Sequence, residues 1–190
     1  MQQHGRTLLF HDNLIEQMMT LRAAALRPQE NDPDRFGSNA NVKFFRALVR
    51  LMQDAPPSDP ARDECRLGNA MGSAYCHRRR AKLGRRCRLF FRCDSKAKVI
   101  LRAWVNDERI RRSSGCKSDP YAVFEKMLGR GNPPDDRSAL VAASKPDWGK
   151  GEQAFLMWPE TIMYTTARIS SRAFVPRAWL AFHRKHCCVP

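Results

Sequence analysis

Long apolar runs are absent from this sequence, and so is any Cys-x-x-Cys pair. No stretch is apolar enough to span a bilayer, and the first residues do not lead into a signal peptide. The 7 cysteines are an odd number, without the spacing of a disulfide framework or a zinc site. We therefore expect a cytoplasmic protein with free thiols and without a membrane partner.

Histidine is scarce where acid–base chemistry would need it. His77 is the only histidine in the central part of the chain. The closing histidine and cysteine residues, within 183–188, are of metal-binding types, but no second cluster lies at a usable spacing. We expect an exposed tail there, and we expect no metal ion or other cofactor.

Basic residues are abundant instead. The sequence has 34 Lys and Arg residues against 19 Asp and Glu residues, which gives a net charge of +15. An excess of this size favours a polyanionic partner, such as a nucleic acid, an acidic protein or an anionic membrane surface. The 190 residues, of which 43% are hydrophobic, fit one domain with an ordinary core and an extension.

Residues 78–106 are both strongly basic and regular in pattern. From residue 86 to 93, Cys, Leu and Phe alternate with arginines and Phe90, as in a strand that buries one side. After a short polar turn, a second alternating run over 99–106 places Arg102 and Trp104 on one side. The two runs predict an antiparallel hairpin, preceded by a shorter strand that ends before Gly84. We expect its open face to offer arginines and two rings to a phosphate chain and its bases.

Amphipathic helices are predicted before and after this region. The first spans about residues 12–27, and the second about 39–54; prolines follow both. A third helix begins after Asp119, which can cap it, with proline at the first position. We expect the first two helices to cover the inner face of the sheet, and residues 1–11 to form an extended lead-in.

Four segments of the chain carry a recognisable pattern. They resemble the YhaV toxin family of the RelE/ParE-like superfamily of bacterial toxin–antitoxin systems, and the resemblance covers about residues 4–143, including Leu8-Leu-Phe-His11. The four segments are Arg88-Leu-Phe-Phe-Arg92, Trp104-Val-Asn-Asp-Glu108, Lys117-Ser-Asp-Pro-Tyr-Ala-Val-Phe124 and Met127-Leu-Gly-Arg-Gly-Asn-Pro-Pro134.

This resemblance implies both a fold and a function. The fold would be α+β, with a small RelE-like antiparallel sheet packed against two N-terminal helices and a further C-terminal helix. Residues 1–143 would form the toxin domain, and residues 144–190 a divergent extension. The activity implied is that of an endoribonuclease, an mRNA interferase that cleaves mRNA during translation on the ribosome. A PrlF-type antitoxin would neutralise it, and the toxin–antitoxin complex would bind operator DNA.

Metal-independent RNA cleavage requires a proton-transfer group and cations that stabilise the pentavalent phosphate. Superfamily members use clustered basic residues for this chemistry, which points to the basic run. Lys82 is its one lysine, and neighbouring cations lower the pKa of a lysine toward the range in which it exchanges a proton. We therefore expect Lys82 to be the proton-transfer residue. We expect Arg80, Arg88 and Arg92 to clamp the phosphate.

Further basic residues and two rings are expected to bind the RNA chain. The ring of Phe90 or Trp104 would stack on a base, with about 1–3 kcal/mol per stacked base. His77 is a second candidate for the acid, against the simpler interpretation of an exposed loop residue. Each arginine has the alternative of being solvated or of pairing with the antitoxin. The basic residues expected to bind RNA are Arg79, Arg86, Arg112 and Lys117.

Two other interpretations remain open at this point. Cys87 stands where the family has an aromatic residue, Arg111 where it has Leu, and Arg137 where it has Trp. These departures favour a relative that has lost catalysis and binds nucleic acid and antitoxin as a corepressor. The second alternative is a basic nucleic-acid or ribosome-associated protein without a toxin role.

Overall fold

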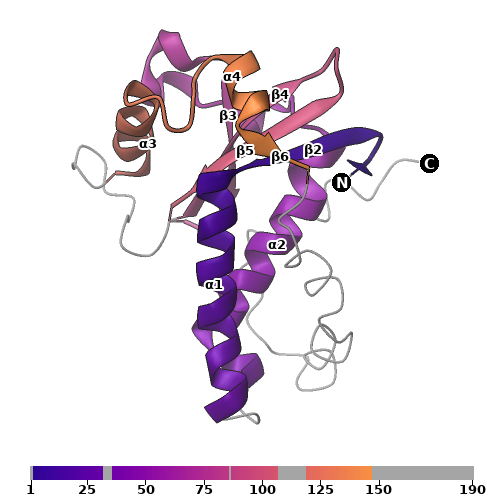
Figure 1. The fold of residues 1–190 in the computed structure, drawn as a ribbon, viewed down its shortest axis with the longest axis vertical. Helices are drawn as coiled ribbons and strands as arrows, with labels where there is room; N and C mark the ends of the chain where they lie inside the picture. The colour runs from indigo at the N-terminus through magenta and orange to yellow at the C-terminus, as the bar shows by residue number, and fades with distance from the viewer. Residues whose placement is uncertain (1, 32–35, 86, 107–118, 147–190) are drawn as a thin grey trace.

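The fold is α+β, as predicted. The computed structural model describes residues 2–31, 36–85, 87–106 and 119–146 (Figure 1). Within these ranges a twisted sheet lies across the molecule, with the long helices α1 and α2 side by side against one face and α3 against the other (Figure 1). The expected covering of one sheet face by the two N-terminal helices is confirmed.

The sheet is mixed rather than purely antiparallel. In the described residues its strand order is β1-β2-β5-β4-β3, with β6 paired to β2. Neighbouring strands are antiparallel except β2 and β5, which run parallel. The strands are β1 (Gln2–Gln3), β2 (Arg6–His11), β3 (Arg78–Leu83), β4 (Cys87–Asp94), β5 (Val99–Val105) and β6 (Ser144–Lys145).

Four α-helices and several 3₁₀ turns complete the described chain. The predicted end of the first helix before Pro28 is wrong, because the helix continues through this residue to Asn31. The second helix likewise runs on past its predicted end. The α-helices are α1 (Asp12–Asn31), α2 (Ala40–Ser58), α3 (Pro120–Gly129) and α4 (Arg137–Ala142). The 3₁₀ turns are η1 (Phe36–Ser38), η2 (Asp63–Cys65), η3 (Gly68–Met71) and η4 (Ser73–Tyr75).

The predicted hairpin is present as β4 and β5, and β3 adds a third antiparallel strand. Gly84 makes the turn between β3 and β4 with a positive φ of 59°, which glycine adopts without strain. Leu89 and Phe91 of β4 are fully buried in the core that α1 and α2 cover. Of the cysteines in the described ranges, Cys65, Cys76, Cys87 and Cys93 are all free thiols, as expected.

A β-bulge in β5 changes the predicted sidedness of this strand. Trp104 pairs with Phe90, but Arg102 pairs with Phe91, so Ala103 is left between two successive pairs. The bulge turns Arg102 away from the side that holds Trp104 and toward α1 and α2. The prediction that Arg102 and Trp104 share a face is therefore wrong.

Arg102 is held inside the main core. It is 1% exposed, its guanidinium lies 5.1 Å from the centre of the Phe10 ring, and it donates a hydrogen bond to the carbonyl of Met52. Within the described ranges no carboxylate pairs with it. Burying a guanidinium without an opposite charge is costly, because little in the surroundings replaces its hydration.

Residues 2–11 were expected to be part of a lead-in, but they form the strands β1 and β2 of the sheet and the turn between them. Strand β2 pairs in parallel with β5, with Thr7 opposite Val99. At its end, the Nδ1 atom of His11 accepts a hydrogen bond of 3.2 Å from the backbone N–H of Asn13, in the first turn of α1. This bond satisfies one of the free donors at the start of the helix. None of the helices in the described ranges is long and apolar enough to cross a membrane.

We predict that Arg102→Met leaves the free energy of unfolding unchanged or raises it by about 1–4 kcal/mol, because an apolar chain of similar length removes the buried charge. Arg102→Ala should lower it by roughly 2–5 kcal/mol through the cavity left behind. Urea unfolding of both variants measures the difference. A loss in Arg102→Met as large as in Arg102→Ala would mean that the bond to Met52 outweighs the cost of burial.

Strand β6 lies just past residue 143, where we expected the toxin domain to end. It pairs with β2, and Lys145 forms an ion pair of 2.8 Å with Asp12. We predict that a chain ending after Pro146 folds, whereas one ending after Val141 unfolds at lower urea because it lacks β6. Circular dichroism during urea titration distinguishes the two, and aggregation of the longer fragment would show that residues beyond 146 complete the core.

Candidate functional site

The register of β3 and β4 decides which basic side chains share a face. Paired residues of antiparallel neighbours point to the same side of a sheet, and so do alternate residues of one strand. Five basic side chains therefore lie on the face opposite α1 and α2, and we call this surface the cationic face. Its members are Arg78, Arg80 and Lys82 of β3, with Arg88 opposite Lys82 and Arg92 opposite Arg78 on β4.

Burial separates these five side chains into different roles. Lys82 is exposed, Arg80 and Arg92 are half-buried, and Arg88 is only 2% exposed. The Arg88 guanidinium donates to the carbonyls of Cys87 and Arg85, at 2.7 and 3.2 Å. These two hydrogen bonds of the buried Arg88 side chain stabilise the chain between β3 and β4. The prediction that Arg88 clamps a phosphate is wrong for this structure, because a ligand cannot reach it.

Arg92 lies at the other end of the cationic face from Lys82, and its guanidinium is already hydrogen-bonded there. Arg92 is opposite Arg78, four residues along β3 from Lys82, which at about 3.3 Å per residue is roughly 13 Å. Its Nη1 atom donates a 2.7 Å hydrogen bond to the carbonyl of Asp135. The predicted single clamp of Arg80, Arg88 and Arg92 is therefore not assembled. Of these three arginines, Arg88 lies opposite Lys82 but is buried, and Arg80 is the one beside Lys82 that is only half-buried.

Asp135 is hydrogen-bonded to three side chains at the end of the cationic face away from Lys82. His77 and Arg78 contact its carboxylate, and Arg92 contacts its backbone carbonyl. Its Oδ1 atom lies 2.9 Å from both His77 Nε2 and Arg78 Nε, and the adjacent carbonyl of Pro134 accepts from Arg78 Nη2 at 2.6 Å. His77 is thus a half-buried partner of a carboxylate, not an exposed loop histidine. The sequence carries little sign of this cluster beyond an acidic pair that follows two prolines.

The pKa values in this cluster follow from burial and pairing. Burial by itself would raise the pKa of Asp135, but hydrogen bonds from His77 and Arg78 outweigh it and hold the pKa below its usual value of 3.8. Burial lowers the pKa of Arg78, while the Asp135 carboxylate acts in the opposite direction. The pair therefore carries full charge at neutral pH and ties the chain after α3 to β3.

Aromatic rings cover the centre of the cationic face. Phe124 of α3 stacks on Phe90 at 4.3 Å and on Trp104 at 5.7 Å between ring centres. Phe90 is fully buried and Trp104 is 4% exposed, so the prediction that Phe90 stacks a base is wrong, and Trp104 offers no open ring face. Tyr121 packs edge-on against Phe90, and the Arg80 guanidinium lies 5.5 Å from the centre of its ring.

Of the other basic residues expected to bind RNA, Arg79 is the one that lies within the described residues. Arg79 pairs with Phe91, whose ring is buried under α1 and α2, so Arg79 projects from the opposite side of the sheet. Arg79 is therefore not part of the cationic face. Arg86, Arg112 and Lys117 lie outside the described residues.

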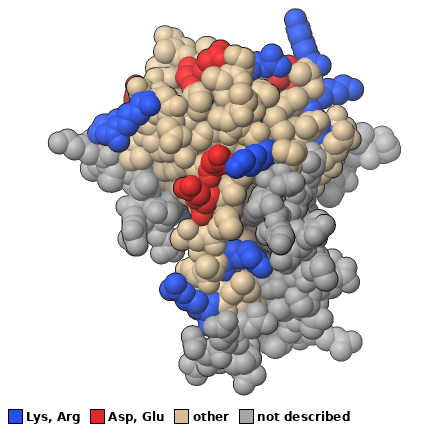
Figure 2. Space-filling view, viewed as in Figure 1, with Lys and Arg blue, Asp and Glu red and all other residues tan. Residues whose placement is uncertain are grey.

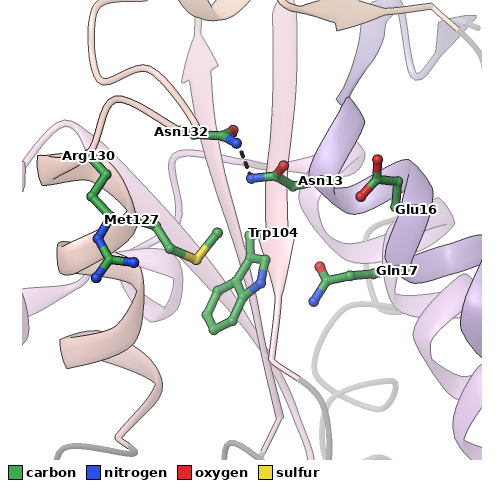
Figure 3. A pocket seen from close by; sticks show the side chains of 7 residues that line it. All are labelled: Asn13, Glu16, Gln17, Trp104, Met127, Arg130 and Asn132. Atoms are coloured by element: carbon green, nitrogen blue, oxygen red, sulfur yellow. Dashed lines mark hydrogen bonds between the residues drawn. The ribbon is translucent and has the colours of Figure 1, made fainter.

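An open pocket lies beside Trp104, between α1 and the end of α3 (Figure 3). It has a volume of about 370 Å³. On the face seen in Figure 2, acidic side chains lie over the first turns of α1, and basic side chains lie close beside them. The pocket is lined by Asn13, Glu16, Gln17, Trp104, Met127, Arg130 and Asn132. Among the described residues, no group of His, Cys, Asp and Glu is arranged to hold a metal ion.

Comparison with known proteins identifies the family. A family model described as a toxin with endonuclease activity, of a toxin–antitoxin system, matches residues 8–145. The chain belongs to the YhaV toxin family. It is 35% identical over 133 residues to the ribonuclease toxin YhaV of Escherichia coli K12, covering 69% of this chain and 82% of that protein. It is 34% identical over 140 residues to the toxin YhaV of Escherichia coli O6:H1 (strain CFT073), covering 73% and 91%. No solved structure matches the chain significantly.

The YhaV match confirms the family expected from the four short segments. Members are toxins with endonuclease activity, and a toxin of such a system has an antitoxin as partner. The matched residues include all of the cationic face and the pocket beside Trp104. Both surfaces therefore lie within the part of the chain that the family shares.

We predict that Asp135→Asn lowers the free energy of unfolding at neutral pH by about 1–2 kcal/mol, since it leaves buried Arg78 without an opposite charge and Asp135 is partly screened by solvent. The carboxylate stabilises the fold fully above the unfolded pKa of 3.8, and this is lost as the pH falls through the lower folded pKa. Urea unfolding of both proteins should therefore differ at pH 7 and converge as the pH falls through the folded pKa of Asp135. Exposed Asp63→Asn is the control, with little change expected.

Proposed function

We propose that this YhaV-family protein is an endoribonuclease toxin that cleaves mRNA in the cytoplasm during translation. The observation that carries the proposal is the placement of Arg80 and exposed Lys82 on one sheet face, in a family of toxins with endonuclease activity. The name of the Escherichia coli K12 relative, a ribonuclease toxin, supports RNA as the substrate. The excess of positive charge suits a phosphate chain.

The reaction that fits these groups needs no metal ion. The 2′-oxygen of the RNA attacks the neighbouring phosphorus, a bond to phosphorus forms, and the bond to the 5′-oxygen breaks. Lys82 serves as the proton-transfer residue for this exchange, in which the 2′-hydroxyl loses a proton and the leaving 5′-oxygen gains one. Arg80, held between the carbonyl of Arg66 at 2.6 Å and the ring of Tyr121, stabilises the charge on the phosphate.

Further contacts to the RNA chain would come from more distant residues. Arg92, at the other end of the cationic face, contacts a different phosphate from the one beside Lys82. Arg86, Arg112 and Lys117 remain proposed RNA contacts. Phosphate contacts of this kind set the register of the chain and do not distinguish bases.

A PrlF-type antitoxin is the proposed partner, and the complex of both proteins would bind operator DNA. The support is the family itself, because its members belong to toxin–antitoxin systems. An antitoxin that covers the exposed end of the cationic face would exclude RNA from Lys82. We further propose that the toxin domain is the part matched by the family and that the remaining C-terminal residues are an extension.

Two departures from the family pattern have structural roles that do not involve the Lys82 side chain, which weakens the corepressor alternative. Cys87 lies in the main core, and its thiol donates to the carbonyl of Asn106 at 3.6 Å. Arg137 forms an ion pair of 2.6 Å with Asp94 at the far end of β4. Neither residue touches the exposed part of the cationic face.

Lys82→Ala and Arg80→Ala should each reduce RNA cleavage by about 100-fold or more, because one removes proton transfer and the other removes phosphate stabilisation. Cleavage of a labelled mRNA, with and without translating ribosomes, measures the effect, and growth arrest on induced expression should disappear. Unchanged cleavage by the double variant would rule out this site.

Two controls accompany this experiment. Lys96→Ala removes an exposed charge in the turn between β4 and β5, and Arg79→Ala removes a half-buried charge from the other side of β3; both variants should cleave RNA normally. Antitoxin capture should remain measurable for the Lys82 and Arg80 variants. If these variants lose antitoxin binding but keep cleavage, the cationic face is an antitoxin interface instead.

A further inference from the structure

The pocket beside Trp104 has a rigid frame. The side-chain amide of Gln17 makes two hydrogen bonds with the backbone of Val105, at 2.6 and 3.2 Å, where β5 continues beyond the end of β2. Asn13 of α1 donates a 3.0 Å bond to Asn132, which joins α1 to the chain after α3. Trp104 is fixed against Phe124, with ring planes 6° apart. The pocket is therefore formed before a ligand arrives, as small-molecule sites commonly are.

Its two charged groups stand on opposite walls. Glu16 extends from α1 on one side, and Arg130 extends from the end of α3 on the other, with Trp104 and Met127 between them (Figure 3). Neither forms an ion pair with any residue in the described ranges, although the chain carries a net charge of +15. The Glu16 carboxylate therefore has no ion-pair partner in the described ranges, although the chain is rich in cations. It is available to a ligand that donates hydrogen bonds.

The pocket also adjoins the proposed catalytic surface. Arg80, Phe90 and Trp104 face one another across three neighbouring strands, so Trp104 lies two strand spacings, about 10 Å, from Arg80. The aromatic residues of α3 fill the space between them. A polynucleotide bound at Lys82 and Arg80 can therefore place a nearby nucleotide in the pocket.

We propose that this pocket binds a guanine base of the RNA substrate, an inference that rests on the proposed ribonuclease function. Guanine alone among the four bases presents two adjacent N–H donors, on N1 and N2, which match the two oxygens of the Glu16 carboxylate. Uracil, cytosine and adenine each place a carbonyl or ring-nitrogen acceptor beside their donor, and a carboxylate repels these acceptors. Arg130 on the opposite wall suits guanine O6 and N7, the acceptors that arginine commonly binds.

The apolar part of the pocket fits the body of the base. The thioether of Met127 and the indole edge of Trp104 provide polarisable contacts. The volume of about 370 Å³ lies in the range of small-ligand sites. The pocket would thereby supply the sequence preference that phosphate contacts cannot give.

Binding of single nucleotides tests the pocket without any need for cleavage. Guanosine 5′-monophosphate should bind the full-length protein more tightly than the adenosine, cytidine and uridine monophosphates in calorimetric titrations. Glu16→Gln should weaken its binding about tenfold or more and reduce the preference for guanine. Glu125→Gln makes the same change at an exposed position of α3 outside the pocket and should bind like the unaltered protein. Equal affinity for all four nucleotides would overturn the proposal.

Cleavage then shows whether the pocket serves the enzyme. RNA oligonucleotides that differ only in the position of one guanine should be cut by the unaltered protein at a fixed distance from it. Glu16→Gln should lose this position preference, and Arg130→Gln should weaken it relative to Lys126→Gln. A preference retained in Glu16→Gln overturns the guanine site while leaving the ribonuclease function intact. If the unaltered protein cleaves no RNA, the result counts against the ribonuclease function. In that case the nucleotide titrations alone test whether the pocket binds guanine.

A protein partner would give a different result. If Glu16→Gln weakens capture of the antitoxin but changes neither nucleotide binding nor cleavage preference, the pocket is part of a protein interface and the proposal fails. Circular dichroism of the variants controls for folding, and little change is expected because Glu16 and Arg130 are both exposed.

Discussion

The stacking of Phe124 against Phe90 and Trp104 is the contact on which the arrangement of the functional surfaces depends. It fixes α3 over the middle of the sheet, and each such ring pair contributes about 0.5–1.5 kcal/mol beyond the area that it buries. Because the rings occupy the centre, the open parts of this face lie on either side of them. Arg80 and Lys82 remain on one side, and the pocket beside Trp104 lies on the other. One packing contact thus separates a surface for phosphate from a surface for a base.

Elements that are set by residues close together in the chain, such as strands and helix caps, could be predicted from the sequence. The burial of single side chains, which depends on how distant segments pack together, could not. The hairpin of β4 and β5 follows from alternation, and Asp119 caps α3 because its side chain accepts from the N–H of Tyr121. The bulge that turns Arg102 inward leaves no mark in the alternating pattern. The burial of Arg88 likewise depends on how distant segments pack, so a chemically sensible prediction of a phosphate clamp was wrong in its most buried member.

The placement of basic residues shows why charge alone is a poor guide to a binding surface. Arg78, Arg88 and Arg102 are each exposed by 2% or less, and they hold segments together through backbone carbonyls or a carboxylate. Arginine suits this role, because its five donors can join several acceptors at once while its charge persists. Part of the positive charge that suggested a nucleic-acid partner therefore serves the fold, and the exposed cation Lys82 carries more of the functional argument than the count of basic residues.

The parallel pairing of β2 with β5 has a consequence for how the protein is made. Thr7 and Val99 are neighbours in the sheet but about ninety residues apart in the chain. At synthesis rates of about 5–20 residues per second, the N-terminal strand waits roughly 5–18 seconds before its partner exists. During this time the nascent chain can form its first helices but cannot close the sheet on which a toxic surface would depend. The order of the strands therefore delays the pairing of β2 with β5 until about half of the 190 residues have been translated, which separates the start of synthesis from the onset of toxin activity.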